Sequence, residues 1–181
     1  MNITIRQASA GDTPLVAWTV LTALDLKEED FDMQLFHTMC GNAETMYSWR
    51  NSFIAEVDGV AVGCLIAYEG RRYLELRDRT WPQLWGNIDP DYLARIEPEA
   101  LAGEFYLDSM AIQPHSRGLG IGHRLMQAAM TRGRALGCQW ATLIVDVHKP
   151  RLHDYYQRIG FEDYGQMEFF GHDYHRMRVS L

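Results

Sequence analysis

The sequence has no long uninterrupted hydrophobic run, and the residues after Met1 do not form the apolar core of a secretion signal. A helix that crosses a bilayer needs about 20 apolar residues, so we expect a cytoplasmic protein without a membrane partner. Cysteine is scarce as well. Cys40, Cys64 and Cys138 are far apart and lack metal-ligand spacing, and the seven histidines are scattered. We therefore expect free thiols in a reducing compartment, and no bound metal.

Positive charge is also in short supply. Lys and Arg total 17 against 24 Asp and Glu, which leaves a net charge of −7. This balance argues against a basic surface for nucleic acid, so we expect no nucleic-acid partner. The charge is uneven, because residues 115–158 carry seven basic and two acidic side chains. That segment suggests a small polyanionic ligand, although a solvated row of arginines would look the same.

The composition is that of an ordinary globular protein. The chain has 181 residues, 47% of them hydrophobic and 12% aromatic, which predicts one domain over residues 1–181. Alternation, turn and capping patterns predict a mixed α/β arrangement. Expected strands are 3–7, 53–58, 60–68, 104–113, 138–147, 161–170 and 173–179, and expected helices begin near Thr13, Phe31, Gly122 and Pro150. Asp58-Gly59 is a strong hairpin signal between the second and third strands.

An unusual segment lies between the third and fourth expected strands. Residues 69–102 are rich in charged and aromatic side chains and are interrupted by Pro82, Pro90 and Pro98. We expect an irregular or short-helical insertion broken at these prolines, serving as a lid or wall beside a site.

The most informative stretch is a glycine-rich turn after the fourth expected strand. Closely spaced glycines at the start of a helix let successive backbone N–H groups point into one concavity, which suits a phosphate. Arg117, with Arg124 further along the helix, would add charge-assisted contacts. The spacing Gly118-x-Gly120-x-Gly122 fits neither the dinucleotide fingerprint nor the nucleotide-triphosphate loop.

The segment Arg117-x-x-Gly120-x-Gly122 resembles the cofactor loop of the GNAT superfamily of N-acetyltransferases, which use acetyl-CoA. A second segment, from Tyr156 to Phe161, resembles the Tyr-x-x-x-Gly-Phe segment of the same family, in the order that the family requires. The resemblance implies a central mixed, mostly antiparallel seven-stranded sheet flanked by helices. It also implies direct transfer of an acetyl group from acetyl-CoA to an amine, without a covalent acyl-enzyme.

The resemblance further implies which residues bind the cofactor. Backbone groups of three residues on the fourth strand would pair with the pantetheine arm, and the glycine loop would hold the pyrophosphate. Lys149 stands where many members have an asparagine, so it would contact the cofactor or meet a phosphate. The implied set is Met110, Ala111, Ile112, Arg117, Gly118, Leu119, Gly120, Ile121, Gly122 and Lys149.

Acyl transfer to an amine also needs a proton acceptor and an acid for the leaving thiolate. The resemblance places Tyr156 as the acid, with Tyr155 as the fallback and simple packing under the cofactor as the alternative. Strand alternation puts Glu104, Tyr106 and Asp108 on one face, with Phe105, Leu107 and Ser109 on the other. Tyr106 occupies the position of the glutamate base of the histone-acetylating branch, so only Glu104 and Asp108 remain as a shared acceptor. Alternatively, Asp108 only hydrogen-bonds a loop.

The acceptor is expected near the first helices, the insertion and the last hairpin. Aromatic residues there, together with Asp25, Glu28, Glu29, Asp30 and Asp32, favour a small cationic amine, although a solvated acidic face explains these acids more simply. A protein N-terminus or lysine is the other acceptor class. A non-catalytic acyl-CoA-binding or sensing module is the rival function, and a homodimer is compatible with either.

Overall fold

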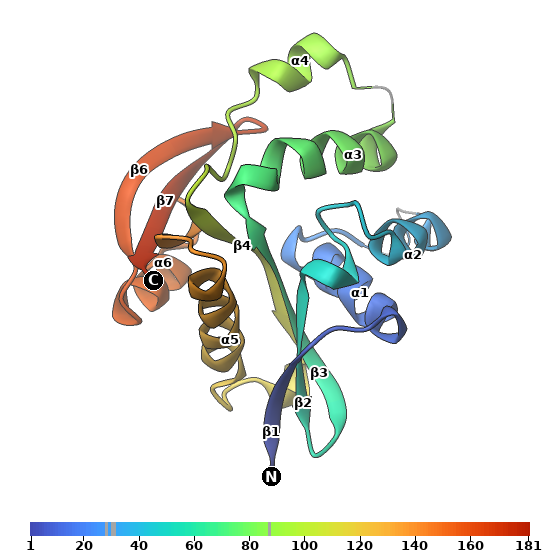
Figure 1. Ribbon diagram of the computed structural model, residues 1–181, viewed down its shortest axis with the longest axis vertical. Coiled ribbons are helices and arrows are strands. Elements are labelled where there is room, and N and C mark those ends of the chain that lie inside the picture. Colours follow the sequence, from blue (N-terminus) through green and yellow to red (C-terminus); the bar gives the residue numbers. More distant parts are fainter. Residues whose placement is uncertain (28, 30–31, 87) are drawn as a thin grey trace.

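One seven-stranded sheet, in the order β1-β2-β3-β4-β5-β7-β6, organises the chain (Figure 1). The computed structural model describes residues 1–27, 29, 32–86 and 88–181. Its strands are β1 (Ile3–Gln7), β2 (Ser52–Val57), β3 (Val60–Glu69), β4 (Glu104–Ile112), β5 (Trp140–Asp146), β6 (Glu162–Phe169) and β7 (His172–Ser180). Its α-helices are α1 (Thr13–Ala23), α2 (Met33–Gly41), α3 (Tyr73–Trp85), α4 (Pro90–Arg95), α5 (Ile121–Ala135) and α6 (Pro150–Arg158). Among the described strands β4 and β5 form the one parallel pair, which confirms the expected mixed, mostly antiparallel sheet.

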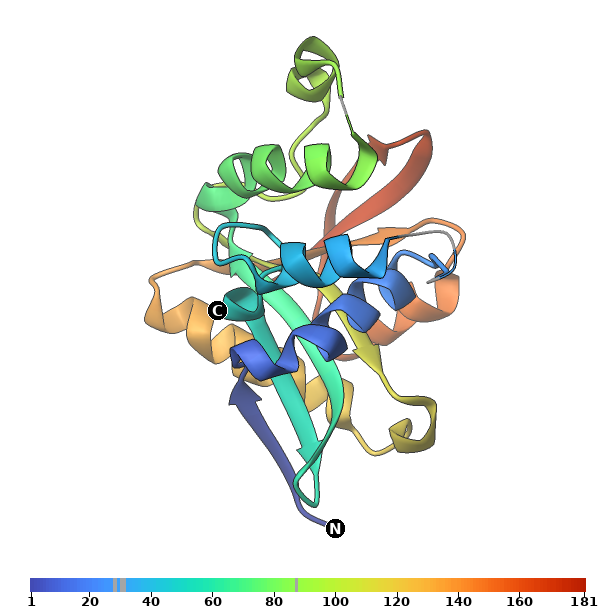
Figure 2. The same cartoon turned by 90° about the vertical axis from the view of Figure 1, so that its right-hand side faces the viewer.

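Helices cover both faces of this sheet. Figures 1 and 2 show α1 and α2 on one face and α5 on the other. β3 is nearly continuously apolar because alternate residues serve two cores: Cys64 and Ile66 face α1, whereas Leu65 and Ala67 face α5. The predicted β2–β3 hairpin is confirmed, with positive φ at both turn residues, 50° at Asp58 and 84° at Gly59.

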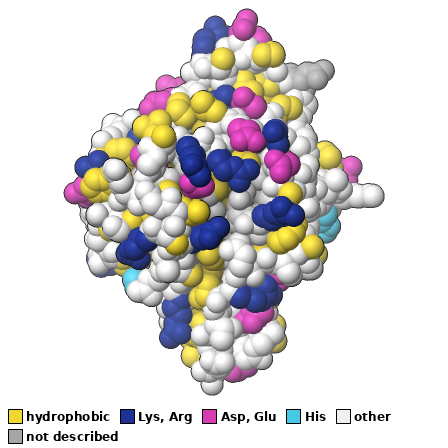
Figure 3. Space-filling view, viewed as in Figure 1, with side chains coloured by type: hydrophobic (Ala, Val, Ile, Leu, Met, Phe, Trp, Pro, Cys, Tyr) yellow, Lys and Arg dark blue, Asp and Glu magenta, His cyan; other side chains and the backbone are white. Residues whose placement is uncertain are grey.

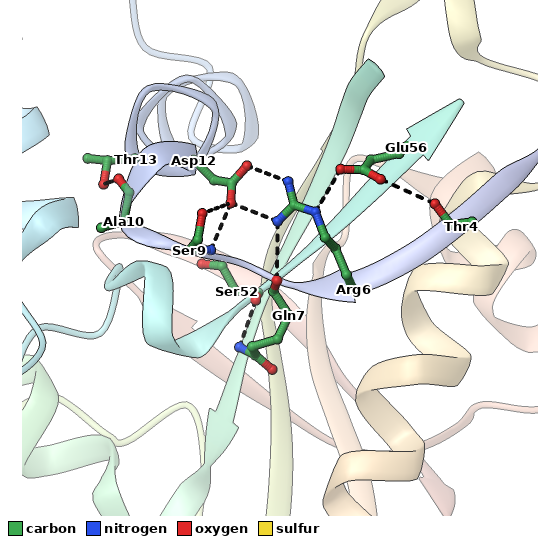
Figure 4. A network of polar contacts seen from close by, with 9 residues as sticks. All are labelled: Thr4, Arg6, Gln7, Ser9, Ala10, Asp12, Thr13, Ser52 and Glu56. Carbon is green, nitrogen blue, oxygen red and sulfur yellow. Dashed lines mark hydrogen bonds and ion pairs between the residues drawn. The ribbon is translucent and has the colours of Figure 1, made fainter. Parts of the chain in front are cut away.

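A charged network ties the first strand to its surroundings (Figure 4). The Arg6 guanidinium donates to both carboxylate oxygens of Asp12 at 2.8 Å and to Glu56 at 2.7 Å. Asp12 also accepts from the Ser9 backbone N–H, at 2.7 Å. Its bonds to Arg6 lower the pKa of Asp12 well below its usual value. The network therefore connects β1, β2 and the entrance to α1.

The insertion folds into a short 3₁₀ turn (Gly70–Arg72) followed by α3 and α4, above one end of the sheet (Figure 2). The expected break at Pro82 is wrong, because α3 continues through Pro82 to Trp85. Proline removes one helical hydrogen bond, and burial of Leu76 and Trp81 on this helix offsets that loss. The two stems of the insertion touch at Gly70, where a Cβ would overlap the Leu101 carbonyl.

Other boundaries agree closely with the sequence patterns. α5 ends before Gly137, which has the expected positive φ of 80°, and α6 begins at Pro150. The expected helix start at Phe31 lies outside the described residues, and α2 is described from Met33. The three cysteines, all in the described part, are free thiols, as expected. Within the described chain no helix combines the length and the apolarity that crossing a bilayer requires.

Candidate active site

A cleft opens where β4 and β5 separate. The two strands pair over three residues each, from Glu104 opposite Trp140 to Tyr106 opposite Thr142, and then diverge. The space beyond has a volume of about 610 Å³ and is lined by β4, β5, α3, α6 and the β6–β7 turn. The separation of the strands thus leaves one edge of β4 free for a ligand.

A β-bulge shapes β4 at the cleft. In the ladder with β3, Leu107 pairs with Ala67 and Ser109 pairs with Ile66, so Asp108 is an extra residue. Paired residues share a face, which puts Ser109 on the Ile66 side of the sheet, together with Asp108. The expectation that Ser109 lies opposite Asp108 is therefore wrong, since the bulge interrupts simple alternation.

The free edge of β4 offers backbone groups to the cleft. The Gln113 N–H donates to the Val62 carbonyl at 2.8 Å, so Gln113 and Ala111 direct their backbone groups toward β3. Met110 and Ile112, the alternate residues, direct theirs to the open side. Of the three strand residues expected to bind cofactor, these two direct backbone groups away from β3, although the Ile112 carbonyl already accepts from Arg117, whereas Ala111 is engaged with β3.

The glycine loop adjoins this edge. Gly118 and Gly120 have φ of 79° and 74°, a region that favours glycine. The Arg124 N–H donates to the Gly120 carbonyl at 3.2 Å as the first bond of α5, so the earlier N–H groups of the helix point outward. The Arg117 Nε donates to the Ile112 carbonyl at 3.1 Å and joins the loop to β4. The Arg124 guanidinium donates to the Ile3 carbonyl at 3.4 Å, and its expected contact with a phosphate stays a prediction.

Helix α6 supplies the opposite wall of the cleft. Lys149, Leu152 and Tyr156 line it. Tyr156 packs edge-on against Tyr155 and Phe161, with ring centroids 5.4 and 5.7 Å away. Burial raises the pKa of Tyr156 to about 12, so its phenol carries a proton at neutral pH. Tyr155, the fallback, packs against the core on the α5 side of the sheet.

Two carboxylates face the cleft, each held by hydroxyl groups. Asp108 accepts from the Tyr68 hydroxyl at 2.5 Å and from Ser109 at 2.8 Å. Glu99 accepts from the Tyr73 and Tyr106 hydroxyls at 2.8 and 2.6 Å. Burial raises the pKa of both, and repulsion from Asp108 helps to raise that of Glu99 to about 7. The cleft therefore holds a pair of carboxyl groups with an unusually high proton affinity.

Glu104 lies outside this group. Its carboxylate accepts from the Leu101 N–H at 2.8 Å, from Thr142 at 3.3 Å and from Tyr164 at 3.2 Å. These bonds join the insertion, β5 and β6 at the start of the β4–β5 ladder. The structure does not bring Glu104 to Asp108, and Glu99 stands beside Asp108 instead.

The sequence patterns did not single out Glu99, which lies in the insertion with no periodic signal around it. The indirect signal was Tyr106. This tyrosine occupies the strand position where the resemblance leads one to expect a glutamate, and its hydroxyl donates to Glu99. A carboxylate from the insertion thus reaches the strand position of Tyr106, beside the Asp108 carboxylate that β4 itself supplies.

Aromatic side chains line one wall of the cleft. α3 contributes Trp81 and Trp85, the end of β6 contributes Phe169, and the β6–β7 turn contributes Phe170. Phe170 lies 5.3 Å from both tryptophan rings and has a positive φ of 51°. The insertion thus forms one wall of the cleft, as its composition predicts.

The described members of the expected acidic cluster have different surroundings. Asp25 lines the cleft, but Asp32 caps α2 by accepting from two backbone N–H groups, and Glu29 lies 3.7 Å from Lys27. Glu28 and Asp30 lie outside the described residues. Charge is mixed on the face shown in Figure 3, where basic side chains gather in the middle and acidic ones lie close to them.

Comparison with known proteins identifies the family to which this fold belongs. Residues 20–161 match the model of the acetyltransferase (GNAT) family. The chain belongs to this family, whose members use acetyl-CoA, and it is an acyltransferase. No protein of curated function matches it significantly.

Solved structures share the fold. A crystal structure of an acetyltransferase has a TM-score of 0.78 and 24% identity over 98% of both chains. An N-acetyltransferase from Staphylococcus aureus Mu50 has a TM-score of 0.78 and 23% identity over 97% of this chain and 100% of its own. A polyamine N-acetyltransferase from Drosophila melanogaster has a TM-score of 0.63 and 16% identity over 99% of this chain and 100% of its own.

Proposed function

We propose that this enzyme transfers the acetyl group of acetyl-CoA directly to the amino group of a small cationic acceptor. The observation that carries the proposal is the placement of Glu99 and Asp108 in the same cleft as Tyr156. A positively charged amine would be attracted to the carboxylates, and the tyrosine would stand on the side of the leaving group. One cleft therefore offers an acceptor end and a cofactor end.

The cofactor end fits a pantetheine arm followed by a pyrophosphate. The backbone groups of Met110 and the N–H of Ile112, which face away from β3, would pair with the amides of the arm, as an added strand does. The N–H groups at the start of α5 would hold the pyrophosphate, together with Gly118 and Gly120. Lys149, at the start of α6, lines the cleft and would add a positive charge. When bound, the cofactor supplies an activated thioester carbonyl.

The acceptor end favours a compact cation. Asp25 and Asp146 line the cleft in addition to the carboxylate pair, so acidic groups outnumber Lys149 there. The aromatic rings in the cleft wall suit the hydrocarbon part of an amine and add cation–π attraction. The volume of about 610 Å³ is in the usual range for small-molecule sites. The Drosophila relative of this fold acts on polyamines, which is compatible with such an acceptor.

The chemistry requires three proton transfers. Glu99 accepts a proton from the acceptor ammonium, since its raised pKa brings its proton affinity closer to that of an amine than an ordinary carboxylate's. Asp108 holds the cation in place and keeps the pKa of Glu99 high. As the new C–N bond forms and the C–S bond breaks, the Tyr156 hydroxyl gives its proton to the departing sulfur. The proton lost by the attacking nitrogen then restores the tyrosine.

The experiment combines calorimetry with acetyl-CoA and CoA with a thiol-release assay over monoamines, diamines, polyamines and N-terminal peptides. We expect binding of both cofactor forms and turnover with small amines. Turnover with peptides alone would favour a protein acceptor. Cofactor binding without turnover on any amine would instead favour the non-catalytic sensing module.

A further inference from the structure

Two histidines and an aspartate from three different elements meet where α6 packs against the β6–β7 hairpin. His153 Nε2 lies 2.9 Å from both carboxylate oxygens of Asp163, and His175 Nδ1 lies 3.4 Å from one of them. One ligand atom from each residue fits within 4.8 Å of the others. The imidazole rings lie beside each other, with centroids 4.4 Å apart.

The topology of the hairpin creates this cluster. Asp163 pairs with Met177, two residues after His175, so Asp163 and His175 project from the same face of the sheet. Met177 belongs to the core against which α6 packs, which brings His153 over that face. The Gln157 side chain, one turn further along α6, donates to Asp163 at 3.3 Å. The carboxylate thus already has an outer hydrogen-bond partner, as metal-binding carboxylates commonly do.

We propose that His153, Asp163 and His175 bind a divalent transition-metal ion, with zinc as the best fit. Zinc bonds of about 2.0 to 2.1 Å in a tetrahedron place neighbouring ligand atoms about 3.3 to 3.4 Å apart. The two histidine–aspartate separations, 2.9 and 3.4 Å, are close to this value, so small side-chain rotations complete the site. Two imidazoles and one carboxylate form a donor set that zinc favours, and water supplies the fourth ligand.

Such an ion would fasten α6 to the hairpin. All residues of α6 are described, and its side chains are at most partly buried, so an ion would add to the packing that holds the helix. Tyr156 lies three residues after His153, and Tyr174, next to His175, lines the cleft. The ion would therefore stabilise two elements that shape the proposed acetyl-transfer site without entering that site.

The test is zinc titration of the chelator-treated protein by calorimetry, with thermal unfolding in parallel. We expect one zinc per chain and, at zinc 100 times its dissociation constant, a rise in Tm of about 5 to 10 °C. Loss of an outer-shell partner weakens metal binding by roughly 10- to 100-fold. Because His153 and His175 are proposed as direct ligands, His153→Gln and His175→Gln should each weaken zinc binding by more than that. His37→Gln, which alters an exposed histidine on α2, is the matched control and should bind zinc like the unaltered protein.

Cobalt(II) gives a readout that does not depend on stability or activity. Bound at this site, it should show the intense visible bands of tetrahedral coordination, and Asp163→Asn should reduce them. The proposal is overturned if the protein binds no zinc, or if the two histidine variants and the control bind it equally. It is also overturned if cobalt gives only the weak spectrum of the hexahydrated ion.

Discussion

Replacing Glu99 with glutamine tests whether this carboxylate takes part in catalysis or only supports the fold. The pKa of Glu99 rises from 4.5 to about 7 in the fold, which means that ionising it in the cleft costs about 3 kcal/mol more than in water. A carboxyl group with a raised pKa stabilises the fold least at high pH: stability falls as the pH rises from about 4.5 through 7, and stays low above that. Glu99→Gln removes the buried charge and still offers a carbonyl oxygen to a tyrosine hydroxyl.

We therefore expect Glu99→Gln to raise Tm at pH 8, by a few degrees up to about 10 °C, while it lowers kcat/KM for the amine by about 10²- to 10⁴-fold. The acidic limb of the kcat/KM profile, governed by this carboxyl group, should disappear. Thiol release measured from pH 5.5 to 9 and differential scanning calorimetry provide the two readouts. Glu97→Gln is the matched control, because Glu97 belongs to the same segment, is 57% exposed and faces Arg176.

Two results would refute the reasoning. If Glu99→Gln retains the turnover and the acidic limb of the unaltered enzyme, Glu99 does not accept the proton, and Asp108→Asn becomes the decisive variant. If Glu99→Gln is instead less stable at pH 8 than at pH 5, relative to the unaltered enzyme, an ionised Glu99 supports the fold.

Three further predictions concern other parts of the molecule. Tyr156→Phe should lower kcat by about 100-fold or more with little change in acetyl-CoA affinity, and unchanged turnover at neutral pH would reject the acid role. Gly120→Ala, at a φ of 74°, should weaken CoA binding in calorimetry and destabilise the fold by about 1 kcal/mol, whereas Gly41→Ala at an open helical position should do neither. Asp12→Asn should cost about 1 kcal/mol in urea unfolding at pH 7. Because the pKa of Asp12 is lowered, that loss should shrink as the pH falls below about 4, and a pH-independent loss would contradict the Arg6–Asp12 account.

Much of the fold follows from local patterns. The hairpin at Asp58-Gly59 and the cap of α5 at Gly137 depend on backbone conformations that neighbouring residues specify, so both were predicted correctly. The effect of Pro82 was predicted wrongly because burial of Leu76 and Trp81, which depends on residues far away in the sequence, offsets its local helix-breaking effect. Ser109 was misplaced because a bulge arises from the pairing of two strands, and one strand's alternation does not contain it.

The functional residues also differ in whether local sequence or tertiary packing places them. The sequence alone located the glycine loop, whose positive φ angles at Gly118 and Gly120 depend on local residues, and it pointed to Tyr156 through a short segment that resembles the family. The open edge of β4 depends on where β4 and β5 diverge, which the tertiary structure decides. Tertiary structure alone decided that Glu99, and not Glu104, stands beside Asp108, and that His153, Asp163 and His175 meet. These groups come from separate elements, and their distances depend on strand register, a bulge and helix packing, which are set by burial over the whole chain.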